Sequence, residues 1–265
     1  MAITTWDGYI GSAKQSISWV KTATRTTIAA QWFSVFDLAG NPGAGTLAGS
    51  STTTGTVPTD ATTGHPIINA FGGGATGYLA QVDFGSTVAC RLKLFDVLWK
   101  GGAYAFNANT SGNTPTSFSS RVPGGTDFTD TQIWVETVTA FTGNQTFNVT
   151  YTNQSGTTGR TTGAVGIGAA PTLGRMWQLP LQAGDTGVQG VTGVVGGTGT
   201  AGTANILVLR PIWTGRVKIA NDGDCHDLTK TGMPIVYADS ALKVMVAADS
   251  TSSGIPELEF VIVNG

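Results

Sequence analysis

The residues best suited to chemistry lie in two short acidic segments. The first, Asp185-Thr186-Gly187, is the tripeptide of aspartic proteases, in which two carboxylates share a proton and a dimer could supply the second copy. In those enzymes the tripeptide ends a hydrophobic strand, whereas here it follows Gln182-Ala183-Gly184 and precedes a glycine-rich stretch. We therefore interpret Asp185-Thr186-Gly187 as a β-turn that uses Asp and Gly for their backbone geometry.

The second segment, Asn221-Asp222-Gly223-Asp224-Cys225-His226-Asp227, holds the densest set of possible metal ligands. Carboxylates at positions 222, 224 and 227 would suit Ca²⁺, and Cys225 with His226 would suit a softer metal. Adjacent Cys and His side chains do not easily reach one ion, and the glutamate that closes an EF-hand loop is missing. We interpret the segment as a polar turn in which an Asp side chain bonds to its own backbone.

No other residues form a catalytic or cofactor-binding pattern. His65 stands before Pro66 without a nucleophile motif, and no G-x-S-x-G sequence occurs. The glycines of Gly163–Gly168 lack the spacing of a nucleotide-binding loop. Cys90 and Cys225 form neither a disulfide framework nor a C-x-x-C metal pair. We predict no catalytic, metal-binding or cofactor-binding residue, no cofactor and no enzymatic activity.

Several aromatic residues are candidates for a platform that binds a sugar or a base. No spacing rule relates them, so we expect them to pack in cores and interfaces instead. They are Trp99, Tyr104, Phe106, Trp134, Trp177 and Trp213.

The composition indicates a folded chain with an uncharged polar surface. Of the 265 residues, 38 are glycine and only 11% are charged, less than half the usual ~25%. Hydrophobic residues reach 40%, which excludes general disorder. The net charge of −2 gives no electrostatic reason to bind nucleic acid or an anionic membrane, and Lys and Arg occur singly, which predicts no basic stripe. No signal peptide or membrane-spanning apolar run is visible, so we expect synthesis in the cytoplasm.

Apolar residues recur mostly with period two, and β-branched residues dominate these runs. This pattern predicts an all-β fold, a β-sandwich or jelly roll with long Gly/Thr-rich loops and at most one or two short helices. One helix is expected over Thr27–Leu38, ended by Gly40-Asn41-Pro42, with an extended arm as the alternative. The predicted strands are Gly77–Phe84, Val88–Trp99, Gln132–Phe141, Gln145–Tyr151, Ala204–Trp213, Ala241–Ala247 and Glu257–Val263.

Three long loops rich in Gly, Thr and Ser separate these strands: Ala39–Gly64, Gly101–Gly125 and Gly184–Gly202. Loops of this length are unusual inside a compact monomer, so we expect a neighbouring subunit to order them. We predict two parts of the chain. Residues 1–64 form an N-terminal arm with a glycine-rich segment that reaches a neighbour, and residues 65–265 form the β-sandwich body.

Read as a whole, the chain resembles a family of tailed-bacteriophage virion structural proteins. The likeness runs in order along most of the sequence and is strongest in Val149–Thr161. The other matching stretches are Met1–Thr5, Leu38–Gly45, Gly77–Leu79, Leu94–Trp99, Gly174–Met176, Leu181–Gln189, Leu207–Ile212 and Gly232–Tyr237. The family offers no catalytic residues to transfer to this chain, and it gives Asp185-Thr186-Gly187 a third reading, as part of a structural turn.

The resemblance implies a virion component made in the host cytoplasm. We expect a capsid decoration or cement protein that bridges subunits of the major capsid protein, with further copies of itself as partners, a trimer being the preferred oligomer. The alternative is a tail, baseplate or fibre-associated protein that binds a host surface glycan. Uncharged Thr- and Ser-rich surfaces suit either role, because many copies can then pack together without charge repulsion. Neither role requires nucleic acid or a membrane as a partner.

Overall fold

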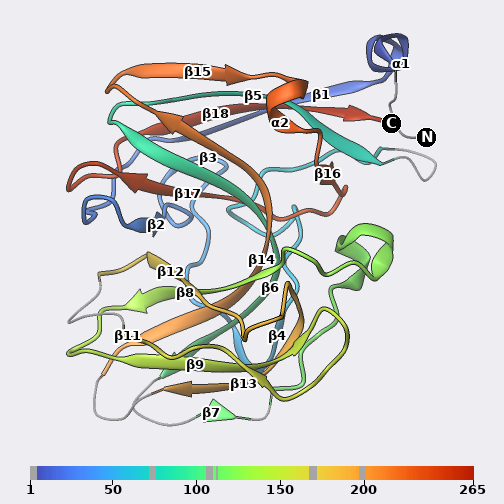
Figure 1. Ribbon diagram of the computed structural model, residues 1–265. Coiled ribbons are helices and arrows are strands. Elements are labelled where there is room, and N and C mark those ends of the chain that lie inside the picture. Colours follow the sequence, from blue (N-terminus) through green and yellow to red (C-terminus); the bar gives the residue numbers. More distant parts are fainter. Residues whose placement is uncertain (1–4, 72–75, 106–109, 112, 167–171, 197–200) are drawn as a thin grey trace.

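The strands form three stacked layers (Figure 1). The structure is a computed structural model that describes residues 5–71, 76–105, 110–111, 113–166, 172–196 and 201–265. A closed barrel occupies the middle of the molecule, and one open sheet packs on each side of it. The prediction of an all-β fold is therefore confirmed, with sheets stacked face to face as in a sandwich.

The upper layer in Figure 1 is an antiparallel sheet of six strands. Its order is β15 (Asp222–His226), β5 (Gly77–Ser86), β18 (Pro256–Asn264), β1 (Lys14–Lys21) and β3 (Gly40–Asn41), and β16 (Ile235–Val236) also pairs with β5. In β1 the residues Ile17 and Trp19 lie opposite Phe260 and Leu258 of β18. All four side chains are buried, because apolar residues alternate in both strands and point to the same face.

The middle layer is a seven-stranded sheet that closes on itself. Its order is β14 (Thr203–Val217), β8 (Gln132–Thr139), β12 (Arg175–Leu179), β2 (Trp32–Ser34), β17 (Leu242–Ala248), β6 (Cys90–Ala105) and β4 (Ser51–Thr56). Because β14 also pairs with β6, all of these strands except β4 form a closed ring. The two long strands β6 and β14 run side by side from Cys90 and Val217 at one end to Ala105 and Thr203 at the other.

The lower layer is a five-stranded sheet, and the helices are few. The sheet order is β10 (Arg160–Thr161), β9 (Thr146–Asn153), β13 (Val188–Gly196) and β7 (Thr110–Ser111), and β11 (Val165–Gly166) also pairs with β9. The α-helices of the described residues are α1 (Trp6–Gly11) and α2 (Leu228–Thr231), with 3-10 turns η1 (Ser119–Arg121) and η2 (Pro123–Gly125). The expectation of at most two short helices is confirmed.

Three hydrophobic cores hold the layers together. The first lies between the upper sheet and the barrel, the second between the barrel and the lower sheet, and the third fills the barrel. Strand β6 serves more than one core, because its side chains alternate. Leu92 and Leu94 belong to the first core, whereas Phe95 and Val97 point into the barrel.

The helix predicted over Thr27–Leu38 is wrong. The backbone N–H of Thr27 bonds to the Thr251 carbonyl (2.9 Å) and that of Ala30 to the Ala248 carbonyl (2.7 Å), which ties the segment to the end of β17. Ala30 has a φ of 63°, a left-handed conformation that ends any α-helix. Strand β2 then follows and pairs with both β17 and β12. The apolar residues of this segment have the spacing of a helix. The hydrogen bonds that β2 makes to β17 and β12 nevertheless favour the extended conformation.

The division predicted at residue 64 does not match a boundary in the structure. Strand β1 lies inside the upper sheet, β2 closes the barrel and β4 pairs with β6. Trp19 and Phe33, which were expected in an arm, are buried in this chain. Of the described residues before 65, helix α1 is the element that projects from the body (Figure 1).

Parts of the three segments predicted as long loops are strands of this chain. Strand β13 occupies much of Gly184–Gly202, β4 lies within Ala39–Gly64, and β6 continues into Gly101–Gly125 as far as Ala105. Residues 106–109 and 112 of Gly101–Gly125, and residues 197–200 of Gly184–Gly202, lie outside the described residues. In β13 the buried valines are interspersed with glycines, which hid the strand from a search for apolar alternation.

Candidate functional site

The outer face of the upper sheet is hollowed and acidic. The hollow measures about 860 Å³ and is lined by residues of β1, β5, β15 and β18, including Asp83, Glu257 and Glu259. Glu259 Oε1 accepts a hydrogen bond from Ser16 Oγ (2.6 Å). Within the described chain, none of these three carboxylates has a Lys or Arg within 4.0 Å. This face therefore presents uncompensated negative charge.

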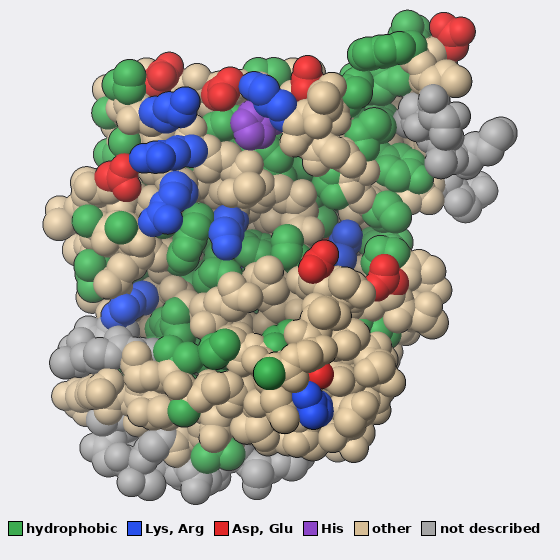
Figure 2. All heavy atoms as spheres, viewed as in Figure 1, with side chains coloured by type: hydrophobic (Ala, Val, Ile, Leu, Met, Phe, Trp, Pro, Cys, Tyr) green, Lys and Arg blue, Asp and Glu red, His purple; other side chains and the backbone are tan. Residues whose placement is uncertain are grey.

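Positive charge gathers where β6 and β14 run together, which corrects the prediction of no basic stripe. Arg91 lies directly opposite Arg216 in the sheet, Lys93 is two residues further along β6, and Lys218 follows β14. Sequence reasoning missed this group, because the two strands are far apart in the chain and only their register brings the cations together. Figure 2 shows a column of Lys and Arg side chains on the face in view.

Two cations of this basic stripe, Arg91 and Lys93, lie against aromatic rings. Lys93 Nζ lies 4.9 Å from the ring centre of Trp32 and 5.2 Å from that of Trp134, and the Arg91 guanidinium lies 5.5 Å from Trp32. Burial lowers the pKa of Lys93. Among the described residues, no carboxylate lies within 4.0 Å of Arg91, Lys93 or Arg216. The stripe is thus an anion-attracting surface separate from the acidic hollow.

Helix α1 is the third exposed feature. None of its residues is buried, and Trp6 and Ile10 are 67% and 70% exposed. Thr5 caps its N-terminus by accepting a hydrogen bond from the Gly8 N–H (3.1 Å), and Lys14 Nζ donates to the carbonyl of Tyr9 (2.8 Å). These contacts are local, so the helix displays two large apolar side chains to its surroundings.

Asp185 lies at the centre of a hydrogen-bond network. The backbone turn here is Gln182–Asp185, closed by the Asp185 N–H on the Gln182 carbonyl (3.0 Å), so the β-turn predicted over Asp185-Thr186-Gly187 is wrong. Its carboxylate accepts hydrogen bonds from Tyr151 Oη (2.6 Å), Asn153 Nδ2 (2.8 Å) and Arg160 Nε (2.8 Å). The hydrogen bond from Arg160 is the main cause that lowers the pKa of Asp185 to about 2. The three donors hold this carboxylate in one place, so its contacts fix the segment to β9 and β10.

Backbone hydrogen bonds and close packing also fix Asp185-Thr186-Gly187 in place. The N–H groups of Thr186 and Gly187 both donate to Gln154 Oε1, at 3.1 and 3.2 Å. A Cβ atom at Gly187 would lie 1.8 Å from the Phe128 carbonyl oxygen, so no other residue fits there without a shift of the backbone. The glycine in this tripeptide is therefore explained by close packing.

Segment Asn221–Asp227 is a strand and a helix cap, so the predicted turn is wrong beyond Asn221. The predicted bonds from Asp side chains to the local backbone are present, because Asp222 Oδ1 and Asp224 Oδ1 accept from the N–H groups of Gly223 and Cys225. Residues 222–226 form β15. This strand pairs with β5 and is the edge strand of the upper sheet. Asp227 caps α2 by accepting from the N–H groups of Thr229 and Lys230, both at 3.1 Å. Across the described residues, no group of three or more His, Cys, Asp or Glu side chains is placed to hold a metal ion.

The neighbours Cys225 and His226 point in opposite directions, as alternation in a strand requires. Cys225 is exposed, and its hydrogen bond to Asp83 is the main cause that raises the pKa of the thiol to about 11. His226 Nδ1 accepts a hydrogen bond from Trp213 Nε1 (2.9 Å). The two side chains therefore cannot share one ion.

Two of the remaining candidates, His65 and Cys90, are buried. His65 is buried beside Phe36, with 4.7 Å between ring centres, and its Nδ1 donates to the Leu242 carbonyl (2.9 Å). Burial lowers the pKa of His65 to about 4. Cys90 is buried in the first core and is not part of a disulfide. Gly163–Gly168 contributes the short strand β11, and its last two residues lie outside the described chain.

The candidate aromatic platform is not assembled. Four of its members are buried, each in one of the three cores: Trp99, Tyr104, Trp134 and Trp213. Trp177 is half-buried against the second core, and Phe106 lies outside the described residues. The expectation that these residues pack in cores is confirmed for the five that the structure describes.

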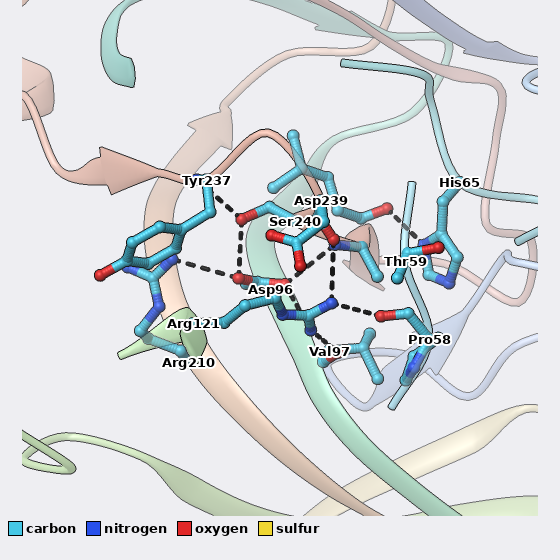
Figure 3. A network of polar contacts seen from close by, with 12 residues as sticks. Pro58, Thr59, His65, Asp96, Val97, Arg121, Arg210, Tyr237, Asp239 and Ser240 are labelled. Carbon is cyan, nitrogen blue, oxygen red and sulfur yellow. Dashed lines mark hydrogen bonds and ion pairs between the residues drawn. The ribbon is translucent and has the colours of Figure 1, made fainter. Parts of the chain in front are cut away.

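The structure adds a buried ion cluster that sequence reasoning missed (Figure 3). Asp96, on β6, is 0% exposed and contacts two guanidinium groups, Arg121 at 2.9 Å and Arg210 at 3.1 Å. Its carboxylate also accepts from Ser240 Oγ (2.8 Å) and the Ala241 N–H (3.0 Å). Asp96 lies in the run Leu94–Trp99, where a single polar residue among apolar ones is the available signal.

A second buried cluster lies inside the barrel. Glu136 on β8 contacts Lys243 on β17 through Oε1 and accepts from Asn205 Nδ2 on β14 through Oε2 (2.9 Å). Burial opposes ionisation of Glu136, but Lys243 and Lys100 outweigh it and hold the pKa of this carboxyl below its usual value. The three side chains of Glu136, Asn205 and Lys243 are at most 3% exposed.

Comparison with known proteins leaves the function of the chain open. No protein-family model matches the sequence, and no curated protein is significantly similar to it. Among solved structures, the chain is similar to infectious bursal disease virus Gx strain and to the VP2 subviral particle of that virus. Each shares 9% identity over 96% of this chain and 80% of the other, with TM-scores of 0.17 and 0.20. Scores this low carry no argument. No helix of the described residues is long and apolar enough to cross a membrane.

The Asp96 cluster predicts a large loss of stability on substitution. Replacing Asp96→Ala leaves Arg121 and Arg210 buried without their counterion, and breaking a buried pair in this way costs about 3–5 kcal/mol. Urea unfolding followed by tryptophan fluorescence measures the loss. Asp249→Ala removes an exposed carboxylate and serves as the control, with a change of about 0.5 kcal/mol or less. Equal stability of the two variants would contradict the prediction.

The Asp185 network predicts a defined pH dependence. Because folding lowers the pKa of Asp185 from 3.8 to about 2, its ionised form stabilises the native state above the higher value, and this contribution is lost as the pH falls toward the lower one. Wild type should therefore exceed Asp185→Asn in urea stability at pH 5, and the difference should shrink between pH 4 and pH 2. A difference that stays constant over this range would exclude the assignment.

Proposed function

We propose that the protein is a non-enzymatic structural component of a tailed-phage virion, and specifically a capsid decoration protein that bridges subunits of the major capsid protein. The observation that carries the proposal is helix α1, which is six residues long and has no buried residue. Isolated helices shorter than about 12 residues are marginal in water. A neighbouring subunit that covers Trp6 and Ile10 would supply the packing that this helix does not find in its own chain.

The rest of the surface supports a role in assembly. The chain carries 30 charged residues in 265, and these leave two separate charged faces, the acidic hollow of the upper sheet and the basic stripe of β6 and β14. Charged faces of opposite sign set the orientation and partner choice of an interface more than its strength. Two such faces on one body suit a protein that must sit in a fixed orientation among neighbours, including copies of itself.

The location in the virion is tested by immunogold labelling of intact particles with an antibody to this chain. Dense, even label over the head is the expected result. Label confined to the tail or its tip would overturn the decoration role and favour the alternative, a tail-associated protein that binds a host glycan.

The α1 contact is tested by substitution. The double variant Trp6→Ala/Ile10→Ala should bind virus particles that lack this protein at least roughly tenfold more weakly than wild type does. Each side chain of this size that a neighbouring subunit buries contributes about 1.5–3 kcal/mol. Its unfolding midpoint should not change, since α1 has no buried residue. Ile219→Ala is the matched control, because Ile219 is also 67% exposed but lies after β14. Particle binding by the double variant equal to that of the control would refute the role of α1.

A further inference from the structure

The buried cluster of Glu136, Asn205 and Lys243 joins an amine, a carboxamide and a carboxylate. The carboxylate lies between the other two, with Lys243 Nζ on one oxygen and Asn205 Nδ2 on the other at 2.9 Å. All three side chains project into the barrel from different strands, and none is more than 3% exposed. Neither the proposed assembly role nor the hydrophobic core requires a reactive amine at this place.

The carboxamide of Asn205 is held and polarised by the backbone. Its Oδ1 accepts a hydrogen bond from the Gly49 N–H (2.8 Å), and its Nδ2 also donates to the Leu47 carbonyl (2.6 Å). A backbone N–H on the carbonyl oxygen stabilises the negative charge that develops there when a nucleophile adds to the carbon. The amide is thus fixed in one orientation with its electrophilic carbon activated.

The amine of Lys243 is enclosed and lies against a carboxylate. Its Nζ is 4.9 Å from the ring centre of Phe36, and the Lys243 side chain is only 3% exposed. Glu136 is in contact with the same nitrogen and can take its proton. A desolvated lysine beside a fixed base is an activated nucleophile.

We propose that Lys243 and Asn205 become joined by an isopeptide bond, formed by the protein on itself with Glu136 as the proton carrier. Glu136 removes a proton from Nζ, and the nitrogen lone pair attacks Asn205 Cγ. The C–O π electrons move to Oδ1, which the Gly49 N–H stabilises. Glu136 then passes the proton to Nδ2, the C=O bond re-forms as the Cγ–Nδ2 bond breaks, and ammonia leaves. The second proton on Nζ passes through Glu136 to the departing ammonia, which leaves as ammonium. Lysine amine and asparagine amide give one new amide and one ammonia, so no oxidant or co-reactant is needed.

Lys100 is also near the Glu136 carboxylate, but its amine is bonded elsewhere. Lys100 raises the positive potential at Glu136, but its Nζ donates to the Thr46 carbonyl at 2.9 Å. Lys243 is therefore the nucleophile, and Lys100 supplies a control.

The bond would connect β17 and β14, which are separated in the barrel by β6. A covalent link across non-adjacent strands prevents the barrel from opening, much as a disulfide does, but without dependence on the redox state of the surroundings. Each chain reacts once, so the reaction is a maturation step and the protein remains non-enzymatic.

The test is the intact mass of the full-length, denatured protein. Wild type should be lighter than its sequence by one ammonia, about 17 Da. Glu136→Gln and Lys243→Arg should show their full sequence masses, and Lys100→Arg should keep the loss. The wild-type mass alone decides whether the bond forms, so a variant that fails to fold does not change that outcome. N-terminal processing shifts all these proteins equally.

Trypsin locates the bond. An acylated Lys243 is not cleaved, so the separate peptides Thr231–Lys243 and Val244–Gly265 should be absent, and one branched peptide should join Met176–Arg216 to Thr231–Gly265. This pattern separates the cross-link from loss of ammonia elsewhere in the chain. Wild-type protein with the full sequence mass and both separate peptides would overturn the proposal and leave the cluster as an ion pair.

Discussion

The carboxylate of Asp96 is the point on which the irregular parts of the structure depend. It is buried in the barrel wall, and it binds Arg121 from η1 and Arg210 from β14. Arg121 in turn donates to the carbonyls of Pro58 and Asp239, so chain segments far apart in sequence are fixed around one charge (Figure 3). A buried charge is costly unless every partner is in place, so this cluster allows one arrangement of these segments and penalises the others.

The barrel divides the molecule into parts with different tasks. Its interior holds charged groups that contact one another. The upper and lower sheets pack against its two outer sides. The surfaces left for partners are then the outer face of the upper sheet, the stripe of β6 and β14, and helix α1. Helix α1 has no buried residue, so changes in its partner contacts need not disturb the fold, whereas Lys93 of the stripe also packs on Trp134 of the barrel core.

The sequence was informative where a strand carries its own pattern and uninformative where pairing decides. The alternation in β18 and the long apolar run of β6 predicted strands close to those observed. The helix over Thr27–Leu38 failed because β2 takes its hydrogen bonds from β17 and β12, which no local window contains. Likewise, Arg91 and Arg216, or Glu136 and Lys243, are more than 100 residues apart, and only the closed barrel makes them neighbours.

The position of β18 between β5 and β1 has a consequence for synthesis. Strand β1 leaves the ribosome long before its main partner β18, which is the last strand of the described chain. Until β18 is made, β1 and β5 both present unpaired backbone toward the gap that it will fill. Such non-local pairing is slow and leaves strand edges open to aggregation, so the upper sheet closes only after translation has passed β18. The nascent chain is therefore a natural client for chaperones that shield strand edges.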